Sequence, residues 1–360
     1  MSAVQAANSV WRLPASSFSR TCERKGGENA TVSRLPPLNP DEWEALRNSL
    51  QTGQMLPELK PLPCNESFRL TLPLHEVERE TARYSLAMGF MVRDVEPYLE
   101  RNMKAIFHLG RAFGSFRLFF VENDSRDRTR ELLRSYMAAH PRVLSGEFMG
   151  NISRAYSVAL CPISRRNCEQ RIRLLARLRQ RVFDLAWAKP GWDALVMLDF
   201  DFAGFARSEF LQMFVLGMRL NASAVVGVSM TLNKYKHCWQ YDRTLLGHNF
   251  RDLTRTMHSH QGHGCMGGIM NGHSGFPTLY ARALRAATPM PRYENQTPIA
   301  IGTSGFNDLA PFNLALSKWG RANGMPMLVD PRFRPLYPYG EGELYLRNAT
   351  LARELWTKPE

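Results

Sequence analysis

Between residues 84 and 230, short apolar runs of strand length alternate with longer segments whose apolar side chains recur at helical spacing. The apolar runs lie at residues 84–92, 116–121, 143–144, 194–198 and 222–230, and the helical segments at residues 95–109, 126–138, 169–188 and 208–218. Continuous apolar runs are typical of strands buried on both faces. Strands that alternate with helices form mainly parallel sheets covered on both sides. The pattern therefore predicts an α/β fold, and ligands of such sheets bind beyond the carboxyl ends of the strands.

The flanks of this alternating region differ from it in composition. Residues 1–70 contain repeated prolines and indicate a tail and lead-in, with one short helix predicted where Asn39 precedes Pro40. Residues 231–275 are rich in His, Gly and Asn, which is typical of loops around a site. We predict one main domain over residues 71–345, with a looped second half, and a tail over residues 346–360.

The chain is strongly basic, with a net charge of +13 and a pI near 9.7. Such a surface attracts nucleic acid, anionic lipid or a phosphorylated small substrate, although a solvated basic face is an equal alternative. The aromatic residues do not interleave with the basic residues in an RNA-binding motif, so we do not expect a nucleic-acid partner.

Signals for cellular location are few. No apolar stretch approaches the roughly 20 residues of a membrane-spanning helix, so no transmembrane segment is expected. Seven Asn-x-Ser/Thr sequons allow a glycosylated, lumenal protein. The sequence leaves the location open: the Golgi or secretory pathway in a eukaryote, and the cytoplasm otherwise.

Two carboxylates separated by one residue, Asp199 and Asp201, directly follow the apolar run at residues 194–198. Hard oxygen ligands of this kind suit Mg²⁺ or Mn²⁺, which commonly bridge protein carboxylates and a diphosphate. A cation there stabilises the charge that develops on a departing nucleoside diphosphate. The pair could instead cap a turn. A phosphohydrolase in which the first Asp is the nucleophile is a rival, disfavoured because Ala203 occupies the fifth position of that signature.

A second polar segment, residues 122–129, follows the apolar run at residues 116–121 and opens a helical segment. Helix capping explains Ser125 and Asp127. Capping does not explain why acidic residues are packed so densely at a strand end. Carboxylates there can accept hydrogen bonds from the ribose or base of a nucleotide. Glu122, Asp124 and Asp127 are therefore candidate donor-binding residues.

Together these segments resemble the GT-A glycosyltransferases, whose fold is a Rossmann-like sheet flanked by helices. Residues 90–96, residues 122–129, the arginine-rich residues 176–181 and the Asp-Phe-Asp at residues 199–201 agree with that family in order and spacing. The most similar subfamily is the fungal capsule-associated α-1,3-mannosyltransferase group, and the yeast mannan polymerase subunits are similar more distantly. The resemblance covers residues 84–340.

The resemblance implies roles for further residues in the first half of the domain. Arg93 and Glu122 would line the nucleoside pocket. Arg179 would face the donor, and Asp199 would also contact the donor through its cation. One departure is Gln180, which stands where the family's helix usually carries Asn. Residues 84–205 would thus form the nucleotide-sugar half of the domain.

In the second half, residues 206–345, the resemblance implies an acceptor region shaped by a small-residue turn at residues 270–276. Asp308 occupies its acidic position as the candidate catalytic residue, although it could also simply cap the helix that begins near Leu309. His273 is the candidate that completes the cation's shell, as a histidine does in some GT-A enzymes. The closest resemblance implies retention of configuration, whereas a general base at Asp308 would suit inversion.

The expected activity is metal-dependent transfer of a hexose, such as mannose, to a glycan hydroxyl. The expected donor is GDP-mannose or a UDP-hexose, and the expected cofactor is Mn²⁺ or Mg²⁺. Three alternatives stay open: a phosphohydrolase built on the acidic pair, a basic nucleic-acid-binding protein, and an inactive relative that binds only the nucleotide sugar.

Overall fold

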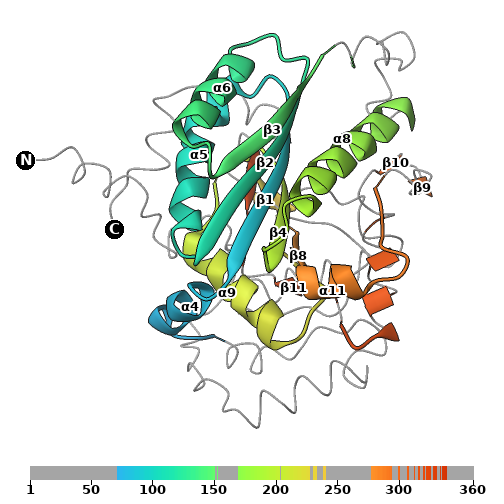
Figure 1. Cartoon of the computed structure of the whole chain (residues 1–360). Coiled ribbons are helices and arrows are strands. Elements are labelled where there is room, and N and C mark those ends of the chain that lie inside the picture. Colours follow the sequence, from blue (N-terminus) through green and yellow to red (C-terminus); the bar gives the residue numbers. More distant parts are fainter. Residues whose placement is uncertain are drawn as a thin grey trace, which may run out of the picture.

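A seven-stranded sheet in the order β11-β5-β8-β4-β1-β2-β3 forms the centre of the computed structural model (Figure 1). The structure describes residues 71–150, 152, 169–202, 204–227, 230–232, 238–240, 277–293, 299–300 and 306–307, with further positions between 312 and 338. The strands of this sheet are β1 (Ser85–Val92), β2 (Ser115–Asn123), β3 (Leu144–Met149), β4 (Ala194–Asp199), β5 (Ala224–Gly227), β8 (Thr278–Tyr280) and β11 (Met327–Asp330).

Most neighbours in this sheet run parallel, and β8 alone among the seven strands is antiparallel to both of its neighbours, β4 and β5. The strands β4, β1, β2 and β3 lie side by side and run parallel, as expected when strands alternate with crossover helices. The prediction of an α/β fold with a mainly parallel sheet flanked by helices is confirmed.

Helices cover both faces of the sheet and create two separate cores (Figure 1). The helices are α4 (Leu74–Thr81), α5 (Glu96–Gly110), α6 (Thr129–Ala139), α8 (Glu169–Trp187), α9 (Arg207–Arg219) and α11 (Ala281–Ala286). Side chains of α5, α6 and α9 pack with Phe90 and Phe120 on one face. Side chains of α8 and α11 pack with Phe119 and Met197 on the other face. Successive residues of a buried strand therefore contribute to opposite cores.

Short strands lie outside the main sheet. β12 (Leu336–Pro338), β6 (Met230–Leu232) and β7 (Cys238–Gln240) form a three-stranded sheet, and β9 (Ile299–Ala300) pairs with β10 (Phe306–Asn307). The single strand predicted over residues 222–230 is thus wrong, because β5 and β6 belong to different sheets. β7 likewise lies within a region that was expected to be loop.

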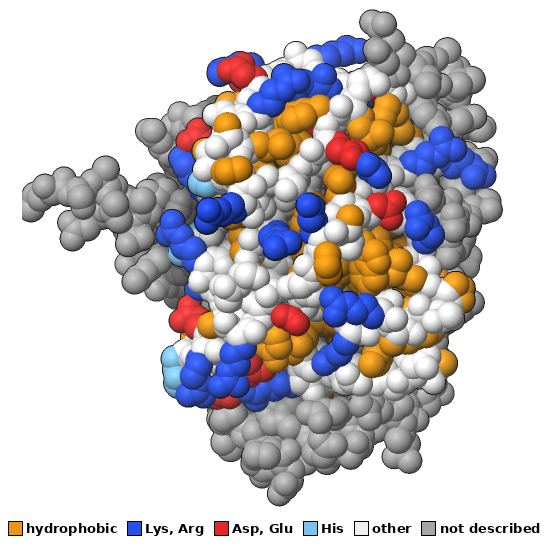
Figure 2. Space-filling view, viewed as in Figure 1, with side chains coloured by type: hydrophobic (Ala, Val, Ile, Leu, Met, Phe, Trp, Pro, Cys, Tyr) orange, Lys and Arg blue, Asp and Glu red, His pale blue; other side chains and the backbone are white. Residues whose placement is uncertain are grey.

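Charged side chains are scattered over the face seen in Figure 2, where basic groups lie in separate patches among acidic and apolar ones. Among the described residues, Lys104 pairs with Glu100 and Arg128 pairs with Glu131. On this face the described residues form no continuous basic stripe of the kind that nucleic-acid binders use. Among the described helices, none is long and apolar enough to cross a membrane.

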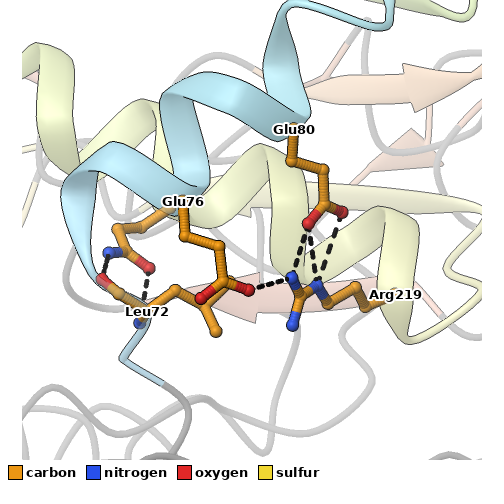
Figure 3. Close-up of polar contacts among 5 residues, drawn as sticks. Leu72, Glu76, Glu80 and Arg219 are labelled. Atoms are coloured by element: carbon orange, nitrogen blue, oxygen red, sulfur yellow. Dashed lines mark hydrogen bonds and ion pairs between the residues drawn. The ribbon is translucent and has the colours of Figure 1, made fainter.

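Helix α4 is fixed to α9 by a cluster of polar contacts (Figure 3). The Arg219 guanidinium bridges two carboxylates of α4, with Nη2 2.7 Å from Glu76 Oε1 and Nε 3.0 Å from Glu80 Oε2. The backbone N–H of Leu72 donates to Gln212 Oε1 at 3.2 Å, and Gln212 Nε2 donates back to the Leu72 carbonyl. These contacts join the start of the described chain to the main core.

The helix expected after Asn39 lies outside the described residues, and the three-part division of the chain stays a prediction.

Candidate functional site

The carboxyl end of β4 carries an ion pair between a strand and a helix. Asp199 is the last residue of β4, and its Oδ1 lies 2.7 Å from Nη2 of Arg179 on α8. The Arg179 side chain is 4% exposed, whereas the Asp199 side chain is 37% exposed. A buried cation thus orients a carboxylate that remains accessible from outside. The structure brings together two residues that the sequence assigned to the donor site.

Asp201 lies in the turn that follows, between two buried aromatic side chains. Phe200 packs on Phe90, with 4.5 Å between ring centroids, and Phe202 packs on Phe205 at 5.6 Å. Asp201 itself is only partly buried. Because both rings are anchored in the core, the turn is fixed at the residues on either side of Asp201.

The donor set at this turn suits a hard divalent cation. Asp199 and Asp201 offer carboxylate oxygens, and among the described residues no group of three or more His, Cys, Asp or Glu side chains is placed to hold a metal ion. Mg²⁺ and Mn²⁺ commonly bind through one or two carboxylates and take their remaining ligands from water and substrate phosphates. The residues present therefore fit such an ion. His273 lies outside the described part of the chain, as does Asp308.

Glu122, near the end of β2, lies on the opposite face of the sheet from Asp199. Its carboxylate is 0% exposed; Oε1 accepts from the Ser125 N–H at 2.8 Å and Oε2 from Arg130 Nε at 2.7 Å. Arg130 Nη2 also donates to the Met149 carbonyl at the end of β3. Glu122 therefore holds the start of its own loop and α6. Its predicted contact with a nucleoside stays a prediction.

The loops that follow β1 and β2 are joined by hydrogen bonds in both directions. Three backbone N–H groups of the first loop donate to side chains of the second, and two of the second donate back. The bonds, donor first, are Asp94 N to Ser125 Oγ (3.1 Å), Val95 N to Thr129 Oγ1 (2.8 Å), Glu96 N to Asp127 Oδ2 (3.0 Å), Arg126 N to Asp94 Oδ1 (2.6 Å) and Arg128 N to Glu96 Oε2 (2.9 Å). Side chains of this kind satisfy the N–H groups left over at helix N-termini.

Asp127 caps two helices at once. Its Oδ2 accepts from the Glu96 N–H at the start of α5, and its Oδ1 accepts from the Thr129 N–H at the start of α6. Desolvation acts to raise the pKa of Asp127, but the hydrogen bonds from Thr129 and Glu96 outweigh it and lower the pKa below its ordinary value. These contacts correspond to the capping role that the sequence allowed, and donor binding by Asp127 stays a prediction.

Arg93 and Asp124 lie at the rim of the same edge. Arg93 is exposed directly after β1, with Nε 3.5 Å from Asp94 Oδ2. Asp94 and Asp124 both have a φ of 53°, and each lies two residues beyond the paired positions Val92 and Glu122. Aspartate is among the few residues that adopt this left-handed conformation readily. The two loops therefore leave the sheet in the same way.

Comparison with known proteins gives a distant likeness only. No protein-family model matches the chain, and no curated protein matches it. One similar solved structure is the mannosyltransferase PcManGT from Pyrobaculum calidifontis in complex with GDP-Man and Mn²⁺. It is 11% identical, with a TM-score of 0.40, over 82% of this chain and 67% of that chain.

A second similar structure is glucosyl-3-phosphoglycerate synthase from Mycobacterium tuberculosis in complex with Mn²⁺, uridine diphosphate and glucosyl-3-phosphoglycerate. It is 13% identical, with a TM-score of 0.37, over 81% of this chain and 86% of that chain. A third, described as a mycobacterial protein, is 13% identical with a TM-score of 0.40, over 80% of both chains. At these values the function of this chain has to be judged from its own residues.

Sequence reasoning missed three residues that shape the site. Arg130 neutralises the buried Glu122, while Arg101 and Asn102 of α5 contact the turn that contains Asp201. No local pattern marks Arg101 or Arg130, because each lies on an ordinary amphipathic helix and meets its partner only in the folded chain. A polar residue at a core-facing helical position, as at Asn102, is the one signal that was available.

Proposed function

We propose that this chain is a metal-dependent glycosyltransferase of the GT-A type, which moves a hexose from a nucleotide sugar to a hydroxyl group of a glycan. The observation that carries the proposal is the accessible Asp199 carboxylate held by the buried Arg179 at the carboxyl end of β4. Asp201 follows two residues later in an anchored turn. Carboxylates that can hold a cation then occupy one edge of the sheet, where α/β folds bind their ligands.

Each group has a distinct role in this proposal. Asp199 and Asp201 would hold Mn²⁺ or Mg²⁺, with His273 as a further ligand, and the bound cation would neutralise charge on the departing diphosphate. Arg179 holds Asp199 in one orientation and adds positive charge at the same point. Asp308 would contribute on the acceptor side, as a general base if transfer inverts configuration.

The nucleoside would bind beside the joined loops after β1 and β2. Arg93 is exposed on the first loop, and Asp124 is partly buried on the second loop. A carboxylate at Asp124 suits the ribose hydroxyls or base, while Glu122 and Asp127 keep the loops in place. The donor we propose is GDP-mannose or a UDP-hexose, and the resemblance in sequence favours mannose as the sugar.

A thermal-shift screen of GDP and UDP, each with and without Mn²⁺, tests the proposal. A ligand that binds only the native state stabilises it by about 2.7 kcal/mol at a concentration of one hundred times Kd. We expect one nucleoside diphosphate to raise Tm strongly only together with Mn²⁺. The variant Asp201→Ala should fold normally and lose the Mn²⁺-dependent part of the shift.

Two results would contradict the proposal. One is a wild-type chain that no nucleoside diphosphate stabilises at any Mn²⁺ concentration. The other is an equal Mn²⁺-dependent shift in the wild type and in Asp201→Ala. Release of phosphate from small phosphoesters without any acceptor would support the phosphohydrolase alternative instead, and transfer to a glycan acceptor would exclude the inactive relative.

A further inference from the structure

The turn that carries Asp201 is bound from inside the protein by one amide group. Asn102 of α5 is 0% exposed, and its Nδ2 donates to the Phe200 carbonyl at 2.6 Å and to the Phe202 carbonyl at 2.9 Å. Those carbonyls belong to the residues immediately before and after Asp201. A primary amide has two N–H donors, so this single side chain uses both of them on one turn.

Arg101 determines which way this amide faces. Its Nε donates to Asn102 Oδ1 at 3.0 Å, and its Nη2 donates to the Phe202 carbonyl at 2.8 Å. Because an arginine N–H occupies Oδ1, the amide nitrogen has to face the two carbonyls. The guanidinium lies over the Tyr98 ring, 5.5 Å from its centroid. Burial lowers the pKa of Arg101 to about 10, so the side chain still carries its charge at neutral pH.

The backbone on both sides of Asp201 is thus restrained in two independent ways. The rings of Phe200 and Phe202 are packed in the core, and their carbonyls are bound by Asn102. A carboxylate on such a turn retains mainly its own side-chain torsions. A site ordered before binding loses less conformational entropy when the ligand arrives.

We propose that Asn102 is a positioning residue for the acidic turn, and that it holds Asp199 and Asp201 in the arrangement that receives the divalent cation. The inference rests on the proposed function, because it assumes that these two carboxylates are the cation ligands. Groups behind the ligands of a metal site typically change metal affinity by about 10- to 100-fold when they are replaced.

The test compares Asn102→Leu with Tyr280→Phe in the full chain. Leucine keeps the branched shape of asparagine, with a somewhat larger volume, and removes its polar atoms. Tyr280 is buried and donates to the Phe214 carbonyl at 2.8 Å, so its replacement also removes one internal hydrogen bond to a carbonyl. Tyr280 pairs with Ala194, the first residue of β4, whereas the acidic turn follows the last one. Tyr280→Phe therefore controls for a general loss of stability.

Two quantities are measured for each protein. Electron paramagnetic resonance of free Mn²⁺ gives the Kd for Mn²⁺ in the presence of GDP or UDP, and amide hydrogen exchange reports the opening of residues 199–202. We expect Asn102→Leu to raise the Kd by about 10- to 100-fold and to accelerate exchange in this segment. Tyr280→Phe should leave both quantities at the wild-type values.

The outcomes separate this inference from the proposed function. If the wild type binds Mn²⁺ and Asn102→Leu binds it equally well, the positioning role is refuted while the proposed function stands. Unchanged exchange at residues 199–202 in Asn102→Leu also refutes the positioning role. A wild type that does not bind Mn²⁺ with either nucleotide overturns both the inference and the function on which it rests.

Discussion

Arg179 on α8 and Asp199 at the end of β4 form one charged unit, with 2.7 Å between Nη2 and Oδ1. The guanidinium is almost completely buried, whereas the carboxylate reaches the surface. The helix that covers one face of the sheet therefore sets the orientation of the acidic residue at its edge. Two predictions concern this pair.

Replacing the guanidinium should slow transfer. We expect Arg179→Met to lower the rate of nucleoside diphosphate release by about 10²–10³-fold, because in the proposed mechanism its charge holds Asp199 in place and stabilises the departing diphosphate. Initial rates with the donor identified by thermal shift provide the measurement. Arg181→Met is the matched control, since Arg181 lies on the same helix but is half exposed and pairs with Glu147. Wild-type turnover by Arg179→Met would show that Arg179 has no part in the chemistry.

The same pair should be coupled in stability. We expect Asp199→Asn to cost about 1–2 kcal/mol, because it removes a charge that compensates a buried guanidinium, and the partial exposure of Asp199 limits the cost. The double variant Asp199→Asn/Arg179→Met should cost less than the sum of the single changes. Urea unfolding of the four proteins measures this coupling. Strict additivity would mean that the two side chains do not interact in solution.

Asp127 should make stability depend on pH. Its folded-state pKa is lowered, so its contribution is present above the unfolded value of about 3.9 and is lost as the pH falls through the folded pKa. Asp127→Ala should cost about 2 kcal/mol at pH 7, since two helices lose a cap. The difference in free energy of unfolding between wild type and variant, measured by urea titration, should narrow below pH 4. A difference that stays constant with pH would contradict the view that the ionised Asp127 carboxylate caps the two helices.

Arg219 should stabilise the contact between α4 and α9 through its planar shape. We expect Arg219→Lys to cost about 1–2 kcal/mol, because an ammonium group cannot bridge Glu76 and Glu80 as the guanidinium does (Figure 3). Arg207→Lys is the control, since Arg207 makes one ion pair with Glu78 across the same two helices. Its cost should stay below about 1 kcal/mol. Equal losses of urea midpoint for the two variants would contradict the bridging role.

The strands that the sequence predicted well are those that are buried along their whole length. β1 and β4 are buried on both faces, and their observed bounds differ from the predicted ones by a single residue. β2 extends further than predicted, because Glu122 and Asn123 are polar yet buried. The ion pair with Arg130 and the hydrogen bond from the Ser125 N–H make a carboxylate acceptable there, and neither contact is visible in the local pattern.

Elements that depend on distant partners could not be predicted. β8 has three residues and lies between β4 and β5, which precede it by more than fifty positions. Its place in the sheet comes from pairing with both neighbours rather than from its own sequence. The split between β5 and β6 has the same origin, since each pairs with a different strand from the end of the chain.

The candidate site was predictable in part. The residue types and their position after apolar strands indicated Asp199 and the segment after Glu122, because strand ends meet at one edge. Alternation along the strands places Asp199 toward α8 and Glu122 toward α6, on opposite faces of the sheet. Asn102 was missed because its role depends on two carbonyls almost one hundred residues away.

The paired loops after β1 and β2 have a consequence for engineering. Each loop supplies acceptors for the backbone of the other, so neither keeps its shape once its counterpart is exchanged. Any exchange of these loops for those of another protein therefore has to graft residues 93–96 and 124–129 together. A graft of only one loop would lack the hydrogen-bond partners that the other loop supplies.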